Sequence, residues 1–244
     1  YDQQARLLPE VYGGPPGEPG AADKKVQAYN FRMCLSSDPA NQAPFPKPKG
    51  YDPKRYELLA RLLKARTEQE GRPPLLNSVI KIDPIPNNKA DINNNGAFST
   101  DYIGGSWEYP DGDYAARERI WQAHVDYVAG FFYFLAHDPR VPKPLQQEMN
   151  QWGLAKDEFV DTSHWPHQLY VREARRMIGE YVVRQKDLQT DLTKPDVIGM
   201  GSYNSDSHNI QRLATQDGFA LNEGDMQVPV TPYQIPYRVM LPRR

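Results

Sequence analysis

The chain has 244 residues, with 29 Lys and Arg against 31 Asp and Glu, so its formal net charge is −2. This balance excludes the broad basic surface of a general nucleic-acid binder and gives no attraction to anionic membranes. A composition of 39% hydrophobic and 25% charged residues suits a folded chain with a core. The single cysteine excludes internal disulfides and cysteine-rich zinc sites. No run approaches the ~18 apolar residues of a membrane helix, so no membrane insertion is expected.

Residues 1–110 contain 14 of the 23 prolines and are predicted to form mainly long, Pro-rich ordered loops. Within them, residues 26–35 alternate in polarity as a strand does. Asp52 and Pro53 begin a predicted helix that ends near Gly71, because Asp caps helices and Pro suits the first turn. Its apolar face comprises Tyr56, Leu59, Leu62 and Leu63.

Residues 111–153 are predicted to be helical. Asp111 or Asp113 caps a long helix that stops at Asp138 and Pro139, and a shorter helix covers residues 143–152. Residues 154–244 are β-rich, with short strands expected at 167–171, 180–183, 197–203, 226–230 and 237–241. The predicted fold class is therefore α+β.

Asp91, Asn93, Asn95 and Gly96 match the first half of a calcium-binding loop, but the twelfth position is Tyr102, where a bidentate Glu is required. A tight turn is the alternative. The five histidines lack the spacing of a zinc set, so no metal is expected; His124, inside the long helix, is either packed or at the surface.

The sequence contains neither a nucleophile elbow nor a phosphate-binding glycine loop, and Gly199-Met-Gly201 is not followed by a helical pattern. Three polar clusters remain, at residues 93–101, 172–176 and 201–208. Each could line a polar pocket, or could be a solvated turn or a structural salt-bridge network.

A series of short segments remains to be interpreted: residues 26–32 (VQAYNFR), 34–35, 44–48 (PFPKP), 50–53 (GYDP), 56–59 (YELL), 89–101, 172–176, 206–208 (DSH) and 235–238 (IPYR). Read together, these segments resemble the large bacterial FAD-dependent oxidoreductases. The resemblance follows the family's order and spans nearly the whole chain.

The resemblance implies that residues 1–244 are the middle, substrate-binding portion of a larger flavoprotein, with residues 154–244 returning toward a missing flavin-binding domain. FAD would be bound in the full-length parent, by a strand, glycine-rich turn and helix that are not found here. We therefore expect the isolated chain to be a fragment that is colourless and inactive. No targeting signal is found, so no localisation is assigned.

The family's chemistry implies hydride transfer from a small polar substrate to the flavin, with a sugar or sugar acid as the preferred class. A base must then accept the hydroxyl proton, and imidazole is suited to this near neutral pH. We expect His208 to be the base and Asp206 to orient it. The candidate substrate-binding residues are Asn30, Arg32, Asn94, Ser99, Asp101, Arg172, Arg175, Tyr203 and Arg238.

Two other classes of function remain open. A non-catalytic carbohydrate-binding or interaction module would use Trp107, Tyr109 and Trp165 as platforms, and a structural segment would use the polar clusters in oligomer contacts. If the clusters instead form one substrate site, residues 93–101 and 202–208 must face one concavity. His208 should then lie within about 20–24 Å of Asp101, or roughly two helix diameters.

Overall fold

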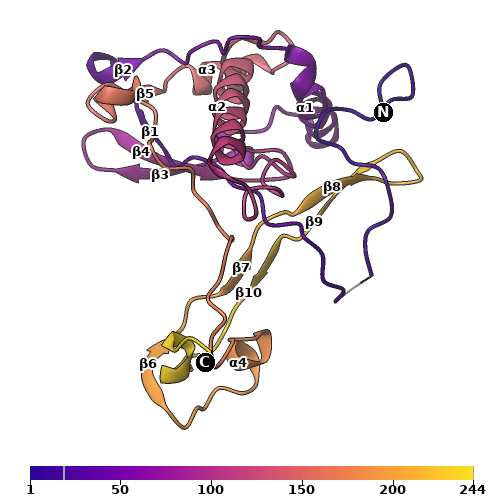
Figure 1. The fold of residues 1–244 in the computed structure, drawn as a ribbon. Helices are drawn as coiled ribbons and strands as arrows, with labels where there is room; N and C mark the ends of the chain where they lie inside the picture. The colour runs from indigo at the N-terminus through magenta and orange to yellow at the C-terminus, as the bar shows by residue number, and fades with distance from the viewer. Residues whose placement is uncertain (19, 244) are drawn as a thin grey trace.

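A five-stranded antiparallel sheet packed against helix α2 forms the larger part of the molecule in the computed structural model, which describes all residues except 19 and 244 (Figure 1). The strand order is β2-β5-β1-β4-β3. The strands are β1 (Met33–Ser36), β2 (Gln42–Ala43), β3 (Ile80–Ile85), β4 (Lys89–Asn94) and β5 (Gly153–Ala155). The predicted α+β class is confirmed.

The two long helices begin where their capping residues predict. The Asp52 side chain accepts a hydrogen bond from the Lys54 amide and starts a 3-10 turn (Pro53–Tyr56) that leads into α1 (Glu57–Glu70). Gly71 ends α1 at a φ of 66°, which glycine adopts without strain. Asp113, not Asp111, caps α2 (Tyr114–His137) by accepting from the Ala116 amide. Helix α3 (Lys143–Met149) is slightly shorter than predicted.

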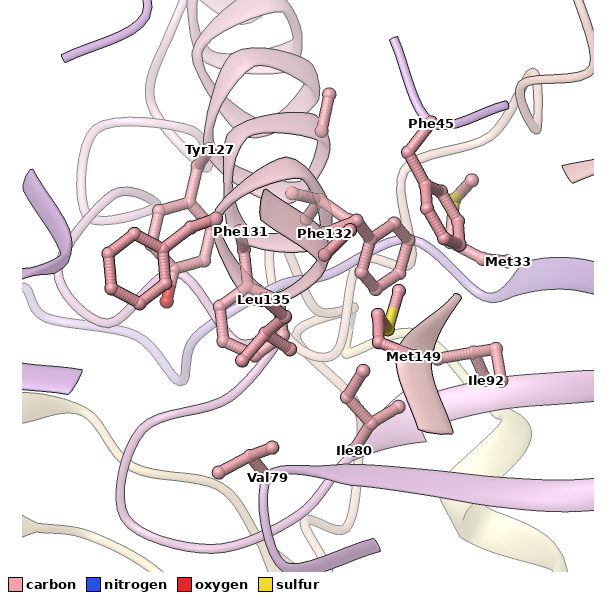
Figure 2. Packing of buried hydrophobic residues seen from close by; sticks show 14 of the residues in the cluster. Met33, Phe45, Val79, Ile80, Ile92, Tyr127, Phe131, Phe132, Leu135 and Met149 are labelled. Atoms are coloured by element: carbon pink, nitrogen blue, oxygen red, sulfur yellow. The ribbon is translucent and has the colours of Figure 1, made fainter. Parts of the chain in front are cut away.

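The core lies between α2 and the sheet. Figure 2 shows Phe131, Phe132 and Leu135 of α2 among Met33, Ile80 and Ile92 of the strands, with Met149 of α3 beside them. All these side chains are buried. Large aromatic rings in this layer bury much apolar surface, which stabilises the packing of helix on sheet.

The β3–β4 hairpin was not predicted. Asn87 and Asn88 turn the chain with φ values of 67° and 56°, a backbone conformation that Asn tolerates better than most residues. Strand β4 includes Asp91 and Asn93, so the half calcium loop is largely a strand followed by a turn at Gly96. The described residues contain no group of three or more His, Cys, Asp and Glu placed to hold a metal.

Two consecutive antiparallel ladders form a long arm in the C-terminal part (Figure 1). Strand β8 (Gln211–Ala214) pairs with β9 (Ala220–Glu223), and β7 (Ser205–Ser207) pairs with β10 (Met226–Val228). The second ladder leads down to a small lower lobe. This lobe contains α4 (Gln185–Gln189), β6 (Val197–Gly201) and β11 (Tyr233–Pro236).

Several predicted strands are wrong in extent or kind. Residues 26–32 lie outside β1 and contribute only isolated bridges, as does Tyr170 within 167–171. Residues 180–183 form no strand, and Tyr237–Met240 is a 3-10 helix. The predictions at 197–203 and 226–230 are confirmed with shorter bounds. Within the described residues, no helix combines the length and apolar character needed to cross a bilayer.

Candidate functional site

His208 lies at the break between the two ladders of the arm. Because it belongs to neither β7 nor β8, its backbone amide is free to donate to Gln27 Oε1 at 2.7 Å. The neighbouring Asn209 carbonyl accepts from the Ala28 amide at 2.9 Å. On the opposite strand, Gly224 has a φ of 108°, and an added Cβ would meet the Ile210 backbone nitrogen at 2.9 Å. The break therefore fixes His208 against residues 27–28.

The His208 ring is paired with Asp101, whose side chain is 2% exposed. Nδ1 of His208 lies 2.7 Å from Oδ2 of Asp101. A carboxylate only accepts hydrogen bonds, so the Nδ1–H donates, and in the neutral ring Nε2 carries the lone pair. Nε2 makes no hydrogen bond with the described residues. This arrangement leaves one ring nitrogen able to accept a proton.

Arg172 joins the other polar groups to this pair. Its Nη2 lies 3.4 Å from Asp101 Oδ1 and 3.3 Å from both Asn30 Oδ1 and Asn93 Oδ1. Its Nε donates to the Ala28 carbonyl, and its guanidinium lies over the Tyr170 ring at 4.9 Å. The side chain is only 9% exposed, so the charge is held in place by Asp101 and by fixed acceptors.

Asn30 and Ser99 also belong to this cluster. The Asn30 amide donates to Asn93 Oδ1 at 3.0 Å and Thr100 Oγ1 at 3.3 Å. Ser99 Oγ accepts from the Asp101 amide, which fixes the loop that carries the carboxylate. Three distant segments thus meet here, around residues 27–30, 93–101 and 172, together with His208.

The remaining candidates lie outside this cluster. Arg32 pairs with Asp91 (Nε to Oδ1, 3.0 Å), and Asn94 ends β4. Arg175 donates to the Pro110 carbonyl, and Arg238 lies in the lower lobe over the Tyr181 ring.

Asp206 lies 3.5 Å from the Tyr203 hydroxyl, and both are exposed. The carboxylate hydrogen bonded to His208 belongs to Asp101 and not to Asp206. Residues 206 and 208 are close in sequence, but the break in the arm turns His208 inward.

Two residues that hold His208 in place, Gln27 and Glu173, were not predicted from the sequence as site residues. Gln27 holds the His208 amide and is itself held by Glu173, whose Oε2 accepts from Gln27 Nε2 at 3.0 Å. Both lie in segments that carried the family resemblance, but nothing in their spacing indicated that they would meet.

The aromatic platforms of the alternative binding module make contacts within the protein, although Trp107 and Tyr109 are only partly buried. Trp165 is 7% exposed and packs edge-on against Phe31. Trp107 donates to the Ile210 carbonyl, and Tyr109 packs edge-on against Tyr29. These contacts favour a structural role for the three rings.

Among the described residues, Gly199 and Gly201 do not form a binding site for the diphosphate of a dinucleotide. Gly199 and Gly201 lie in β6, paired with β11, and the chain continues into β7 and not into a helix. Diphosphate binding of the dinucleotide-fold type needs backbone amides at a helix N-terminus.

The fold is thus α+β, and Asp101, Arg172 and His208 form a largely buried polar cluster within it. The model of the family described as FAD dependent oxidoreductase matches residues 4–244, and the chain belongs to this family. No curated protein and no solved structure matches the chain.

Proposed function

We propose that this chain is the substrate-binding portion of an FAD-dependent oxidoreductase that oxidises a small polar alcohol, with a sugar or sugar acid as the preferred class. In such a reaction the flavin accepts the hydride, while the protein orients the alcohol and removes its hydroxyl proton. Family membership supports the flavin chemistry. The arrangement of Asp101, Arg172 and His208 supports the assignment of substrate binding and proton removal to this chain.

One observation carries the proposal: the 2.7 Å contact between His208 Nδ1 and Asp101 leaves Nε2 unpaired. Asp101 stabilises the imidazolium that forms when Nε2 takes a proton, as a carboxylate does beside a catalytic histidine. Arg172 and Ser99 hold Asp101, and Asn30 accepts a hydrogen bond from Arg172. We place the substrate hydroxyl beside His208 Nε2. We assign the base to His208 and its orientation to Asp101.

The other candidates belong to the same proposal in more distant roles. Arg32 and Asn94 border the cluster through β4, and Arg175 provides a cation near Pro110 for an acidic substrate. Tyr203, Asp206 and Arg238 lie toward the lower lobe. We propose that this lobe faces the flavin-binding domain, because its residues 177–183, 197–203 and 237–240 expose many large apolar side chains.

The test is the reductive half-reaction of the FAD-loaded full-length protein, followed without oxygen as loss of flavin absorbance on mixing with a panel of sugars and sugar acids. His208→Gln should slow the reduction by at least about 100-fold, the lower range for loss of a general base. Asp101→Asn should slow it by a similar factor, and the matched Asp206→Asn by less than about threefold.

The choice between Asp101 and Asp206 depends on this comparison. A larger effect of Asp206→Asn than of Asp101→Asn would instead support Asp206 as the residue that orients His208, as expected from the sequence. Full activity of His208→Gln at every pH would contradict the proposed function.

A further inference from the structure

A polar cavity of about 490 Å³ lies between the N-terminal segment, residues 48–56 and Tyr102. It does not include the Asp101–His208 pair. Its principal lining residues are Glu10, Tyr12, Tyr51, Arg55, Tyr56 and Tyr102. Such a volume is large enough for a molecule of several carbon atoms.

A buried ion pair lines this cavity. Arg55 Nε donates to Glu10 Oε1 at 2.6 Å, and the Glu10 side chain is only 5% exposed. The second oxygen, Oε2, is buried and has no hydrogen-bond partner among the described residues. Burial raises the pKa of Glu10 and Arg55 opposes this, so a further donor would stabilise the carboxylate.

Arg55 carries further hydrogen-bond donors besides its Nε. The hydrogen bond to Glu10 uses only Nε of Arg55, and its Cζ lies 4.8 and 5.1 Å from the ring centroids of Tyr102 and Tyr127. The pair therefore offers both an acceptor without a donor and further donors. A hydroxyl group satisfies both kinds of group, since it donates one hydrogen bond and accepts others.

The charges around the cavity argue against a strongly charged ligand. Asp52 and Asp126 also line it, opposite one further cation, Lys49. Three carboxylates disfavour an anion, while Arg55 and Lys49 disfavour an ammonium group. The tyrosine rings of the walls suit the C–H faces of a ring-shaped ligand and give contact area with little loss of side-chain freedom.

The wall nearest the ion pair depends on close approach of the backbone. Gly104 has a φ of 82°, and an added Cβ would lie 2.4 Å from Cζ of Tyr12. The Tyr12 hydroxyl donates to the Ile103 carbonyl, which keeps this ring against the 102–104 turn. This wall of the cavity is therefore tightly packed.

We infer that this cavity binds a neutral polyhydroxylated ring, such as a monosaccharide or cyclitol, through Glu10 and Arg55. The inference does not depend on the proposed catalytic role of His208. It places a polyol-binding site on the chain separate from the Asp101–His208 cluster.

The experiment is titration of the 244-residue chain with D-glucose and myo-inositol, followed by calorimetry and ligand-observed NMR. Sodium glucuronate and ethanolamine serve as the anionic and cationic probes. We expect saturable binding of at least one neutral polyol and weaker binding of both charged probes. Glu10→Gln and Tyr51→Ala should each weaken polyol binding by at least about tenfold, as loss of a charged acceptor or of an aromatic wall does.

The matched control is Glu68→Gln, the same substitution at an exposed glutamate of α1. It should leave polyol binding unchanged. The melting temperature of each variant is recorded, and Tyr51→Ala preserves the test if Glu10→Gln fails to fold. His208→Asn should also bind normally.

Four results would overturn the inference. The first three are the absence of saturable polyol binding, a preference for glucuronate or ethanolamine, and unchanged affinity in both cavity variants. Loss of binding in His208→Asn alone would place the polyol at the Asp101–His208 cluster. That outcome would refute this second site while supporting the proposed function.

Discussion

At the scale of single residues, the position of His208 depends on a glycine on the neighbouring strand. Gly224 lies opposite the break between β7 and β8, where the chain leaves one ladder and enters the next. Irregularities of this kind re-aim side chains beside functional sites. The Ser207 hydroxyl donates to the Gly224 carbonyl at 2.6 Å and fixes the two strands at this point.

Gly224→Ala should destabilise the fold and displace His208, because the new Cβ would meet Ile210 Cγ1 at 2.7 Å in addition to the strain of a φ of 108°. Gly218→Ala is the matched control, since its φ is 82° and nothing lies within 4 Å. Chemical denaturation should give a loss of about 1–2 kcal/mol for the control from backbone strain alone. The loss for Gly224→Ala should be greater by at least about 1 kcal/mol. Equal losses would show that the break accommodates a side chain.

His124 is buried in α2, which resolves the two alternatives in favour of a packed residue. Its Nδ1 donates to the Ile120 carbonyl at 2.7 Å, and its Nε2 lies 3.3 Å from Ser106 Oγ. Burial lowers the pKa of His124 to about 4, with the Ile120 hydrogen bond opposing the shift. The folded state therefore favours the neutral imidazole.

This lowered pKa predicts a pH dependence of stability. Above about pH 6.5 the ring is neutral in both states, and its contribution is fully present; it is lost as the pH falls from about 6.5 toward 4. A shift of this size corresponds to about 3 kcal/mol when the loss is complete. Urea denaturation at pH 7.5, 5.5 and 4.5 should show a steeper decline for the wild type than for His124→Gln. Parallel declines would contradict the assignment.

At the scale of secondary-structure elements, α2 provides a direct test of helix capping. Asp113 accepts from the Ala116 amide at 2.7 Å and satisfies one of the free donors of the first turn. Asp113→Ala should lower the free energy of unfolding by about 1 kcal/mol, whereas Asp111→Ala should change it by less than about 0.5 kcal/mol. Thermal or urea denaturation measures both. A larger effect at Asp111 would contradict the observed cap.

The helices could be predicted from sequence because caps and apolar periodicity act within a few residues of one another. Strands of three to six residues carry much less local signal, and the pairing of β3 with β4 depends on an unusual Asn-Asn turn. The 237–241 prediction failed because Pro236 led into a 3-10 turn and not an extended strand.

In the candidate site, too, short-range sequence signals could be predicted and contacts between distant segments could not. The requirement that a substrate pocket gather distant polar groups predicted that residues 93–101 and His208 would meet, and they do. The partner of His208 could not be predicted, because Asp101 is 107 positions away and only the fold brings it within 2.7 Å. Asp206 was favoured by its nearness in sequence alone.

At the scale of the whole molecule, stability is unevenly distributed. The apolar core cluster is drawn from residues 26–171, and the lower lobe contributes none of its members. The lobe depends instead on polar contacts. Lys194, with a side chain 2% exposed, lies 3.1 Å from Asp187 and 3.5 Å from Asp191. The Tyr181 hydroxyl donates to Asp187 at 2.5 Å.

Lys194→Met should therefore unfold the lobe without unfolding the core, because it leaves the buried Asp187 carboxylate without its cation. Hydrogen–deuterium exchange should become faster in residues 185–201 and 233–236 and stay slow in α2. Lys186→Met is the control, since its side chain is 58% exposed and 3.8 Å from Asp191. Uniform acceleration across the chain would show that lobe and core unfold as one unit.

The break in the arm also lies between the lobe and the rest of the molecule. His208 follows β7, whose ladder leads to the lower lobe, and precedes β8, so a displacement of the lobe would act directly on the contact between His208 and Asp101. The ring lies 2.7 Å from Asp101, and a hydrogen bond of this kind is lost beyond about 3.5 Å. Less than about 1 Å of travel at the break thus separates an oriented imidazole from a free one. The arm therefore connects the position of the lobe to the orientation of the imidazole that we propose as the base.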